Sequence, residues 1–523
     1  MNPGSTLFAS WHNRLAFWSG SAMVAAGVAL HLPMFWMGRK IGFRLVGMPM
    51  DDGMLVGMGL IVTGVIAAGY GLLPRRPQRG VEGSIAHVAV VQPEDAPLTK
   101  AHWVQIGLLA VALVIDIMKA ATLGFVTPGM RSEYGISSTA VAVLPLCALI
   151  GTTLGSFVWG ALADIYGRRA SILLAAVLFV GTSICGAMPS FAWNVFMCFM
   201  MGLAAGGMLP VANALLAEIM PTKHRGWCLV LIGGIGTIGG YFATSALSAT
   251  LQPYFGWRIM WLLGFPTGLI LIAMSPLLPE SARFLLEMGR VEEAHAILAR
   301  YGGAIATERV SKPVAAAKAK PLFGLSVALT IAALAWGFVN FGVLLWLPAS
   351  LIAEGQSVRL ASELIAKSAL IAVPTVAVAT YLYSIWSTKR VLILAIGITI
   401  LGLLATLLRH SSSLLANPLV SVSLLIVGTS GVISILLPYA AESFPVRQRG
   451  RATGWIAGCS KVGGVMAQGL AAFALVPVFG AAAGAIAVPT VASLLLIALF
   501  GHETRGRDLR ELETSSGRIS SAR

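Results

Sequence analysis

The chain has 523 residues, of which 57% are hydrophobic and only 11% carry a charge, and its formal net charge is +15. Soluble globular domains carry about 25% charged residues, so this composition excludes an ordinary soluble protein. It predicts instead a polypeptide that crosses a lipid bilayer many times.

The hydrophobic residues fall into long continuous runs. A helix that crosses the roughly 30 Å hydrocarbon core of a bilayer needs about 20 apolar residues, whereas the strands of a membrane barrel alternate in polarity. The predicted spans are 15–37, 53–73, 105–127, 139–160, 170–188, 193–217, 227–250, 257–277, 323–349, 362–384, 390–408, 418–439, 452–474 and 480–500. We therefore expect an all-α polytopic membrane protein with about fourteen transmembrane helices.

The spacing of the spans divides the chain into six segments. Two groups of six spans separated by one long basic loop are typical of an internally duplicated transporter. The predicted segments are an N-terminal transmembrane hairpin (1–73), a cytosolic linker (74–104), a six-helix bundle (105–277), a cytosolic connector (278–322), a second six-helix bundle (323–500) and a cytosolic tail (501–523).

The basic residues predict the orientation of the protein. With both termini in the cytosol, 26 of the 36 Lys and Arg residues fall in cytosolic segments, as the positive-inside rule requires. The positive charge therefore reflects topology in the cell (inner) membrane and does not indicate a nucleic-acid partner. Arg39, Lys40 and Arg44 do not fit, because they lie in the outer link of the hairpin. Either this link is interfacial or the hairpin is re-entrant.

Asp116 and Lys119 lie together inside the span 105–127. Charged residues in a membrane helix are costly, so they usually pair or line a wet cavity and have a function. Residues three apart on a helix share a face and can touch. We predict that these two form a binding or coupling site, and the alternative is a purely structural ion pair.

An internal repeat marks the fourth span of each bundle. Residues 217–226 and 441–450 both read Ala-Glu-x-x-Pro-x-x-x-Arg-Gly. Each copy places a carboxylate, Glu218 or Glu442, at a helix end and an arginine, Arg225 or Arg449, seven residues later. We expect these pairs to belong to gate networks on the cytosolic side.

Residues 160–169 contain Gly160, Asp164, Gly167, Arg168 and Arg169. The loop resembles the G-x-x-x-D-x-x-G-R-R loop of the major facilitator superfamily. Its charged residues are expected to lock neighbouring helix ends, and its glycines to permit close helix approach and a sharp turn. The resemblance implies two pseudo-symmetric six-helix bundles that expose a central cavity alternately to each side.

Two further motifs narrow this resemblance. Residues 279–285 and 502–507 resemble boxes of the sugar-porter, organic-ion and aromatic-acid branches. Residues 387–390, in the equivalent loop of the second bundle, lack the Asp and glycines.

Two departures from the family pattern concern the direction of transport. Cys198 stands where relatives often carry an arginine, and residues 233–240 lack the Gly-Pro signature of antiporters. Uptake by symport is therefore favoured over efflux.

Two more lysines lie inside predicted spans. Lys461 precedes a glycine pair, and related carriers often place a basic residue there, facing the cavity. Lys367 follows Glu363 by four residues, an order that favours a local helix pair, so it is the weaker candidate.

Three intramembrane lysines against one aspartate predict a cavity that prefers a small organic anion. The alternative is a sugar or polyol porter, which would need several neutral polar and aromatic groups. Candidates for that lining are Asn213, Trp336, Asn340, Tyr439 and Gln468. A transporter-like membrane sensor is a more distant alternative.

The sequence shows no Walker loop, dinucleotide-binding glycine motif or clustered His/Cys set. We expect no cofactor and no metal, with a proton gradient as the energy source, and we expect a monomer. No nucleophile–base set is evident, so the sequence predicts a transporter and not an enzyme.

Overall fold

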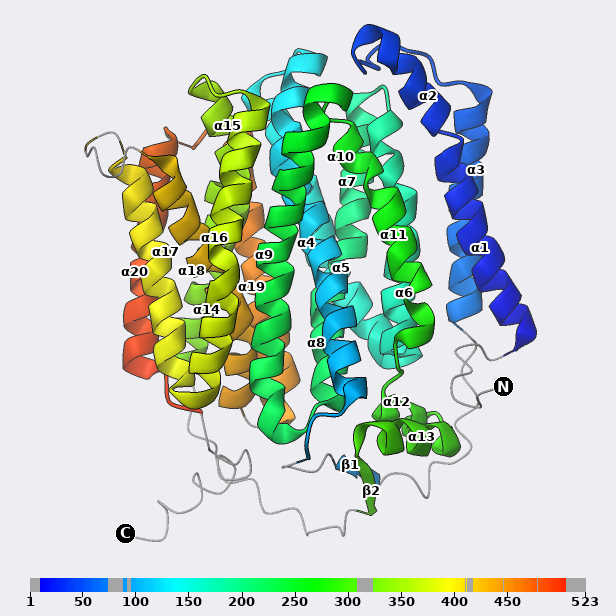
Figure 1. Cartoon of the computed structure of the whole chain (residues 1–523), viewed down its shortest axis with the longest axis vertical. Helices are drawn as coiled ribbons and strands as arrows, with labels where there is room; N and C mark the ends of the chain where they lie inside the picture. The colour runs from blue at the N-terminus through cyan, green and yellow to red at the C-terminus, as the bar shows by residue number, and fades with distance from the viewer. Residues whose placement is uncertain are drawn as a thin grey trace.

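The computed structural model of the chain describes residues 10–73, 88–91, 96–307, 323–409, 411, 417–444, 446–476 and 478–504. Long helices run side by side along the longest axis of the molecule (Figure 1). Within the described residues, thirteen helical segments are long and apolar enough to cross a membrane. The 27-residue helix α19 (Val446–Ala472) occupies the remaining predicted span. The prediction of an all-α polytopic membrane protein is confirmed.

The helices group into a hairpin and two bundles. The hairpin consists of α1 (Trp11–Ala29), α2 (Leu32–Met37), the 3₁₀ turn η1 (Gly38–Ile41) and α3 (Asp52–Leu72). The first bundle consists of α4 (Lys100–Tyr134), α5 (Ser138–Tyr166), α6 (Arg168–Gly181), η2 (Thr182–Ala187), α7 (Phe191–Ala205), α8 (Met208–Ile219), α9 (Thr222–Phe255), α10 (Ile259–Leu262), α11 (Gly264–Ala273) and η3 (Ser275–Leu277). The second bundle consists of α14 (Phe323–Phe338), the π-helical turn η4 (Val339–Val343), α15 (Leu344–Ala353), α16 (Val358–Ile385), α17 (Thr388–Leu407), α18 (Pro418–Ser443), α19 and α20 (Phe479–Phe500).

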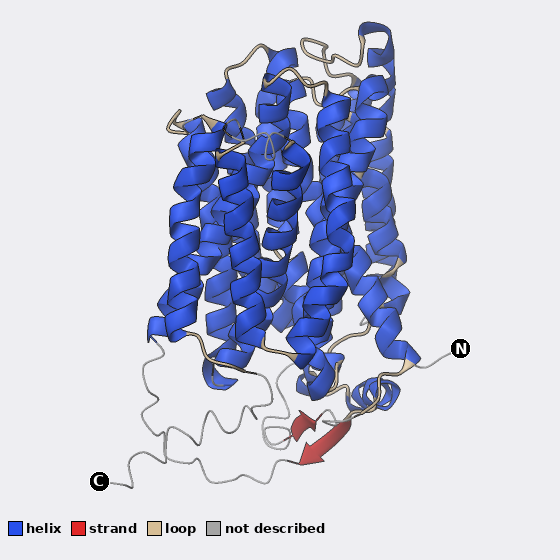
Figure 2. Ribbon diagram, turned by 60° about the vertical axis from the view of Figure 1, so that its left-hand side comes forward, coloured by secondary structure: helices blue, strands red, loops and turns tan. Residues whose placement is uncertain are grey.

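One end of the bundles carries the extramembrane elements. The short helices α12 (Ala282–Glu287) and α13 (Val291–Tyr301) lie there, as Figures 1 and 2 show. We call this end the connector face and the other end the opposite face. Helix α1 begins and α20 ends at the connector face (Figure 1).

A small sheet also lies at the connector face and was not predicted. Strand β1 (Val88–Val91) comes from the predicted linker and β2 (Ala304–Thr307) from the predicted connector. They pair antiparallel, with Val88 opposite Thr307 and Val91 opposite Ala304. The two polar segments that flank the first bundle are therefore joined to each other.

Glycines set the spacing of the hairpin helices. A Cβ on Gly64 of α3 would lie 2.6 Å from the carbonyl oxygen of Gly20, and one on Gly27 would lie 2.5 Å from the carbonyl oxygen of Gly57. Gly57 and Gly64 are seven residues apart, as are Gly20 and Gly27, so each pair lies along one side of its helix. Small residues of this kind let membrane helices approach backbone to backbone.

Replacing Gly64 by leucine is therefore expected to separate α1 from α3. Backbone atoms surround this position, and overpacking typically costs about 1–3 kcal/mol even where side chains can move. Faster hydrogen exchange across α1 and α3 would show the separation. Gly59→Leu on the same helix is the matched control, because a Cβ there meets no atom within 4 Å. Equal exchange in the two variants would contradict this packing.

The hairpin link is docked on the opposite face. The backbone N–H groups of Leu45 and Val46 donate to Oε1 of Glu133 at the end of α4, at 2.8 and 3.3 Å. Phe43 stacks on Phe35 and contacts Phe255 of α9 edge-on. Helices α1 and α3 have 19 and 21 residues, about 28 and 31 Å at 1.5 Å per residue. Each helix of the hairpin therefore has the length of a full span, and its basic link lies on the end of the first bundle.

Candidate transport site and gates

A small central cavity lies between the two bundles. Its lining includes Asn213 of α8, Trp336 of α14, Asn340 of η4 and Lys461 of α19. These are four of the nine residues that we predicted for substrate binding or coupling. The cavity volume is about 30 Å³, whereas a single water needs at least about 10–15 Å³. In this conformation the cavity therefore has room for water molecules but not for an organic solute.

Lys461 is the charged group of this cavity among the described residues. Its Nζ lies 5.2 Å from the centre of the Phe341 ring, and no carboxylate of the described residues lies within 4.0 Å of it. A charge buried without an ion partner is costly. The amine is thus a buried charge whose described partner is an aromatic ring and not a carboxylate.

Asp116 also lies at this interface, on α4. Its side chain is buried, and Oδ1 has no hydrogen-bond partner in the described structure. Lys461 of the second bundle and Lys119 of the same helix both act on this carboxylate electrostatically.

The predicted ion pair between Lys119 and Asp116 is not formed in the structure. Its Nζ donates to the carbonyl oxygen of Phe179 at 2.5 Å and to Oγ1 of Thr182 at 3.0 Å, and within the described residues no contact of 4.0 Å or less joins it to Asp116. Residues three apart on a helix point about 60° apart, enough to turn Lys119 into the first bundle.

The position of Lys119 suits a helix cap. Helix α6 ends at Gly181, so the Phe179 carbonyl is one of its last, and a cation there satisfies it and opposes the negative end of the helix dipole. A Cβ on Gly264 of α11 would lie 2.9 Å from the Lys119 amine. Gly264 therefore leaves the room that this buried side chain needs.

Three other predicted ligands lie outside the central cavity. The side chain of Lys367 is 68% exposed and lies 3.9 Å from Glu363. The hydroxyl of Tyr439 donates to the carbonyl oxygen of His502 at the connector face, at 2.6 Å. Gln468 donates to the carbonyl oxygen of Phe341 and lines a cavity at the opposite face. The structure therefore does not bring these three side chains together with Lys461.

Two polar groups of the cavity are already engaged. The indole N–H of Trp336 donates to the carbonyl oxygen of Thr429 at 2.8 Å. Asn340 accepts a hydrogen bond from the hydroxyl of Tyr241 at 3.1 Å. Its π-helical turn interrupts the ordinary helical bonding, a feature that recurs at functional sites. In contrast, Oδ1 of Asn213 is buried without a partner in the described structure.

Arg168 joins the residues predicted for the gate network of the first bundle, at the connector face. Its guanidinium binds Asp164 and Glu218, each at 3.1 Å. Arg169 is buried and donates to the carbonyl oxygen of Ser275 at 2.7 Å. The 160–169 loop and the 217–226 copy of the repeat, which we identified separately in the sequence, thus meet at Arg168. Arg225 lies half-buried in the first turn of α9.

Glu280 of the connector completes this gate. Its Oε1 accepts the backbone N–H groups of Arg168 and Arg169, at 2.8 and 3.4 Å, where α6 begins. Burial raises the pKa of Glu280, while the hydrogen bonds from Ser281, Arg168 and Arg169 act in the opposite direction. Gly167 has a φ of +101°, and any Cβ there would clash with this carboxylate. At Gly160 a Cβ meets no atom within 4 Å, so the close approach predicted there is absent.

The second bundle repeats the arrangement with other residues. Glu503 accepts the backbone N–H of Thr388 at 2.9 Å, where α17 begins, and also binds the hydroxyls of Thr388 and Ser387. Glu442 accepts from the hydroxyls of Tyr383 and Thr504, each at 2.8 Å. The side chain of Arg449 lies outside the described residues. The 387–390 loop, although it lacks the expected Asp and glycines, therefore keeps the same carboxylate cap.

The opposite face is open. A vestibule of about 860 Å³ lies between α4 and α5 of the first bundle and α15, α19 and α20 of the second. Gln468, hydrogen-bonded to Phe341, lies at this vestibule, and Phe341 contacts the Lys461 amine from the other side. Gln468 and Phe341 thus link the lining of the vestibule to the Lys461 amine of the central cavity. The vestibule thus gives the opposite face a large cavity between the two bundles.

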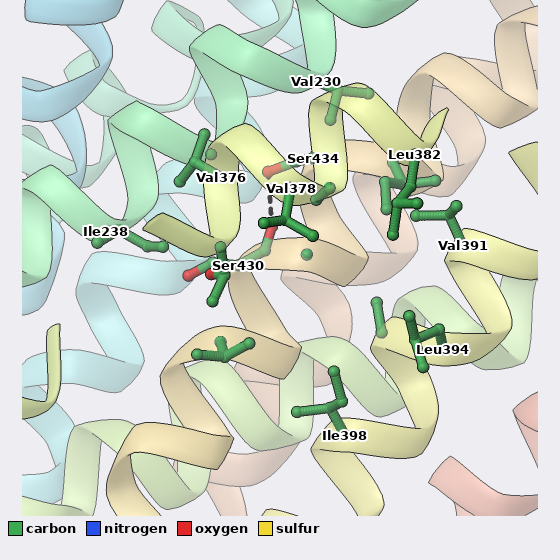
Figure 3. Close-up of a pocket in the computed structure, with 17 residues that line it drawn as sticks. Val230, Ile238, Val376, Val378, Leu382, Val391, Leu394, Ile398, Ser430 and Ser434 are labelled. Atoms are coloured by element: carbon green, nitrogen blue, oxygen red, sulfur yellow. Dashed lines mark hydrogen bonds between the residues drawn. The ribbon is translucent and has the colours of Figure 1, made fainter. Parts of the chain in front are cut away.

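A third cavity, shown in Figure 3, is unsuited to a charged solute. It has a volume of about 140 Å³ and lies between α9, α16, α17 and α18. Its lining is almost entirely aliphatic, and Ser434 turns its hydroxyl to the carbonyl oxygen of Ser430 at 2.5 Å. No lysine, arginine, aspartate or glutamate of the described residues lines it.

Sequence reasoning missed several residues of these sites. Phe341 and Tyr241 have no local signature, because an aromatic residue in an apolar span is ordinary. Arg131 has no local signature either, because the vestibule that it lines depends on the packing of five helices. Glu280 and Glu503 lie in the two boxes whose likeness we noted, but their partners are more than 100 residues away in the chain.

Comparisons with known proteins agree with this geometry. A family model described as Major Facilitator Superfamily matches residues 108–468. The chain is 24% identical over 434 residues to the niacin transporter NiaP of Acinetobacter baylyi, covering 80% of this chain and 98% of that protein. It is 27% identical over 400 residues to the gallate transporter of Pseudomonas putida, covering 71% and 85%.

The fold also matches a solved structure. The partially occluded inward-open conformation of the xylose transporter XylE from E. coli aligns with a TM-score of 0.64 and 18% identity. The alignment covers 78% of this chain and all of that one. At this identity the likeness concerns the fold alone.

Proposed function

The chain belongs to the major facilitator superfamily, and from this premise we propose that it takes up a small organic anion together with protons by alternating access. It is a multi-pass membrane transporter for a small molecule and not an enzyme. The observation that carries the anion proposal is the amine of Lys461, which lines the central cavity without a carboxylate partner among the described residues.

Asp116 supplies a route to coupling. While Asp116 is ionised, its negative charge partly balances Lys461 across the interface. A proton on Asp116 would remove that balance and leave the lysine free for a substrate carboxylate. One proton and one monovalent anion would then cross together without net charge, and each would favour the binding of the other.

The relatives support this solute class. The names of two of them specify niacin and gallate, and both molecules are aromatic carboxylates at neutral pH. The second candidate is a sugar or polyol porter. Asn213 and Asn340 favour it, because both amides line the same cavity and one carbonyl oxygen there has no partner in the described structure.

We further propose that the protein is a monomer in the cell (inner) membrane, with the connector face and both termini in the cytosol. The supporting observation is that most Lys and Arg residues fall in segments on that side. The open vestibule would then face outward, the state that an uptake carrier presents to its substrate.

Proteoliposomes loaded with weak buffer test the function. We expect one carboxylate among nicotinate, gallate and 4-hydroxybenzoate to acidify the interior in a saturable way. Asp116→Asn is expected to reduce that acidification to about a tenth or less, because the amide cannot carry the proton. Sugar counterflow without a pH change would instead establish a porter. Ligand binding without flux would indicate a sensor.

A further inference from the structure

The vestibule at the opposite face contains a single charged group among the described residues, the guanidinium of Arg131. The side chain is exposed, and the ion pairs of the described residues do not include it. Every other side chain of the vestibule lining is neutral. The vestibule therefore has a positive potential, which is strengthened where low-dielectric walls surround the charge.

The nearest carboxylate in the sequence does not neutralise Arg131. Glu133 is 5% exposed and pairs with Arg258 at 2.7 Å. Its other contacts are the indole N–H of Trp257 at 2.8 Å and the link of the hairpin. Glu354 and Glu363 on the same face are paired with Arg409 and Arg359.

The vestibule also has the size and the chemistry for an organic acid. Its volume of about 860 Å³ lies within the roughly 300–1,000 Å³ typical of small-molecule sites, whereas the central cavity accepts only water. Trp346 and Phe479 offer aromatic surface, and Ser138, Thr139 and Ser350 offer hydroxyls. A guanidinium binds a carboxylate with two parallel hydrogen bonds, and aromatic rings pack favourably against a flat ligand.

Resting on the proposed function, we propose that the vestibule is an outer binding site in which Arg131 holds the carboxylate of an aromatic acid before it reaches Lys461. Arg131 belongs to the first bundle, and Trp346 and Phe479 belong to the second. An anion bound here touches both bundles, so their approach at this face would carry it inward past Gln468 and Phe341.

Initial uptake of labelled nicotinate, gallate or 4-hydroxybenzoate at several ionic strengths tests this site. For the acid that wild type transports, Arg131→Gln is expected to lower kcat/KM about tenfold at low salt, because electrostatic steering raises association rates by about 10–1,000-fold and fades with salt. The difference should shrink at high salt, and the maximal rate should change little. Arg359→Gln is the matched control, an arginine on the same face that is already paired with Glu363.

Charge reversal separates this role from a folding defect. In Arg131→Glu, added salt should increase uptake, whereas in wild type it should decrease uptake, and misfolding cannot reverse that sign. An unchanged salt dependence in both variants, with wild type active, would overturn the outer site and leave the proposed function standing. Absence of saturable wild-type uptake of every acid would overturn both.

Discussion

Replacing Glu133 by alanine is expected to cause the largest loss of stability of any single carboxylate substitution considered for this chain. Arg258 is fully buried, and Glu133 binds it at 2.7 Å. Breaking a buried ion pair by removing one partner costs about 3–5 kcal/mol, because the remaining charge stays buried. The backbone N–H groups of Leu45 and Val46 would lose their acceptor as well.

Thermal unfolding in detergent, combined with hydrogen exchange of the hairpin, measures this effect. We expect a lower midpoint and faster exchange in the link between η1 and α3. Glu363→Ala is the matched control, because Glu363 also pairs with an arginine but lies at the surface, where such pairs contribute little. If both variants melted alike, the hairpin would not depend on Glu133 for its position.

The stability of the fold and the ease of predicting it have the same origin. In lipid every backbone polar group must be satisfied within the protein, so each long apolar run becomes a helix. The spans, the internal duplication and the connector-face gate follow from such runs and from short local motifs. The arginine of the gate, Arg168, and its partners Asp164 and Glu218 were all identified in the sequence, and the structure joins them.

The central cavity was harder to predict because apolar residues cover nearly every side of the helices. Asp116 and Lys119 share a span, but nothing in that span indicates which side of α4 turns toward the second bundle. Lys119 donates its hydrogen bonds to Phe179 and Thr182, which are about 60 residues further along the chain. The exposed position of Lys367 was hard to predict for a related reason, since the residues on the lipid-facing side of a helix resemble those on its cavity-facing side.

The two gates show how different sequences reach one arrangement. In the first bundle a carboxylate of the connector, Glu280, accepts the backbone N–H groups at the start of α6. In the second bundle Glu503 does the same at the start of α17, helped by the hydroxyls of Ser387 and Thr388. A carboxylate at a helix N-terminus is favourable for any helix, so the cap persists although the loop motif is lost.

Replacing Lys461 by glutamine should reduce transport as strongly as replacing Asp116 does. Lys461 lines the central cavity, and no second cation of the described residues lines it. A glutamine of similar length can donate a hydrogen bond but cannot balance a carboxylate. Hydrogen bonds to charged groups contribute about 1.5–3 kcal/mol, so uptake of the transported anion should fall at least about tenfold.

Lys367→Gln provides the matched control, since it makes the same change in a lysine that is exposed and lies beside Glu363. Its uptake should stay within about twofold of wild type, because surface ion pairs contribute little. Binding of the same anion to protein in lipid nanodiscs separates affinity from turnover. If Lys461→Gln bound and transported the anion like wild type, the charge preference would arise elsewhere, and the neutral amides Asn213 and Asn340 would become the leading candidates for substrate recognition.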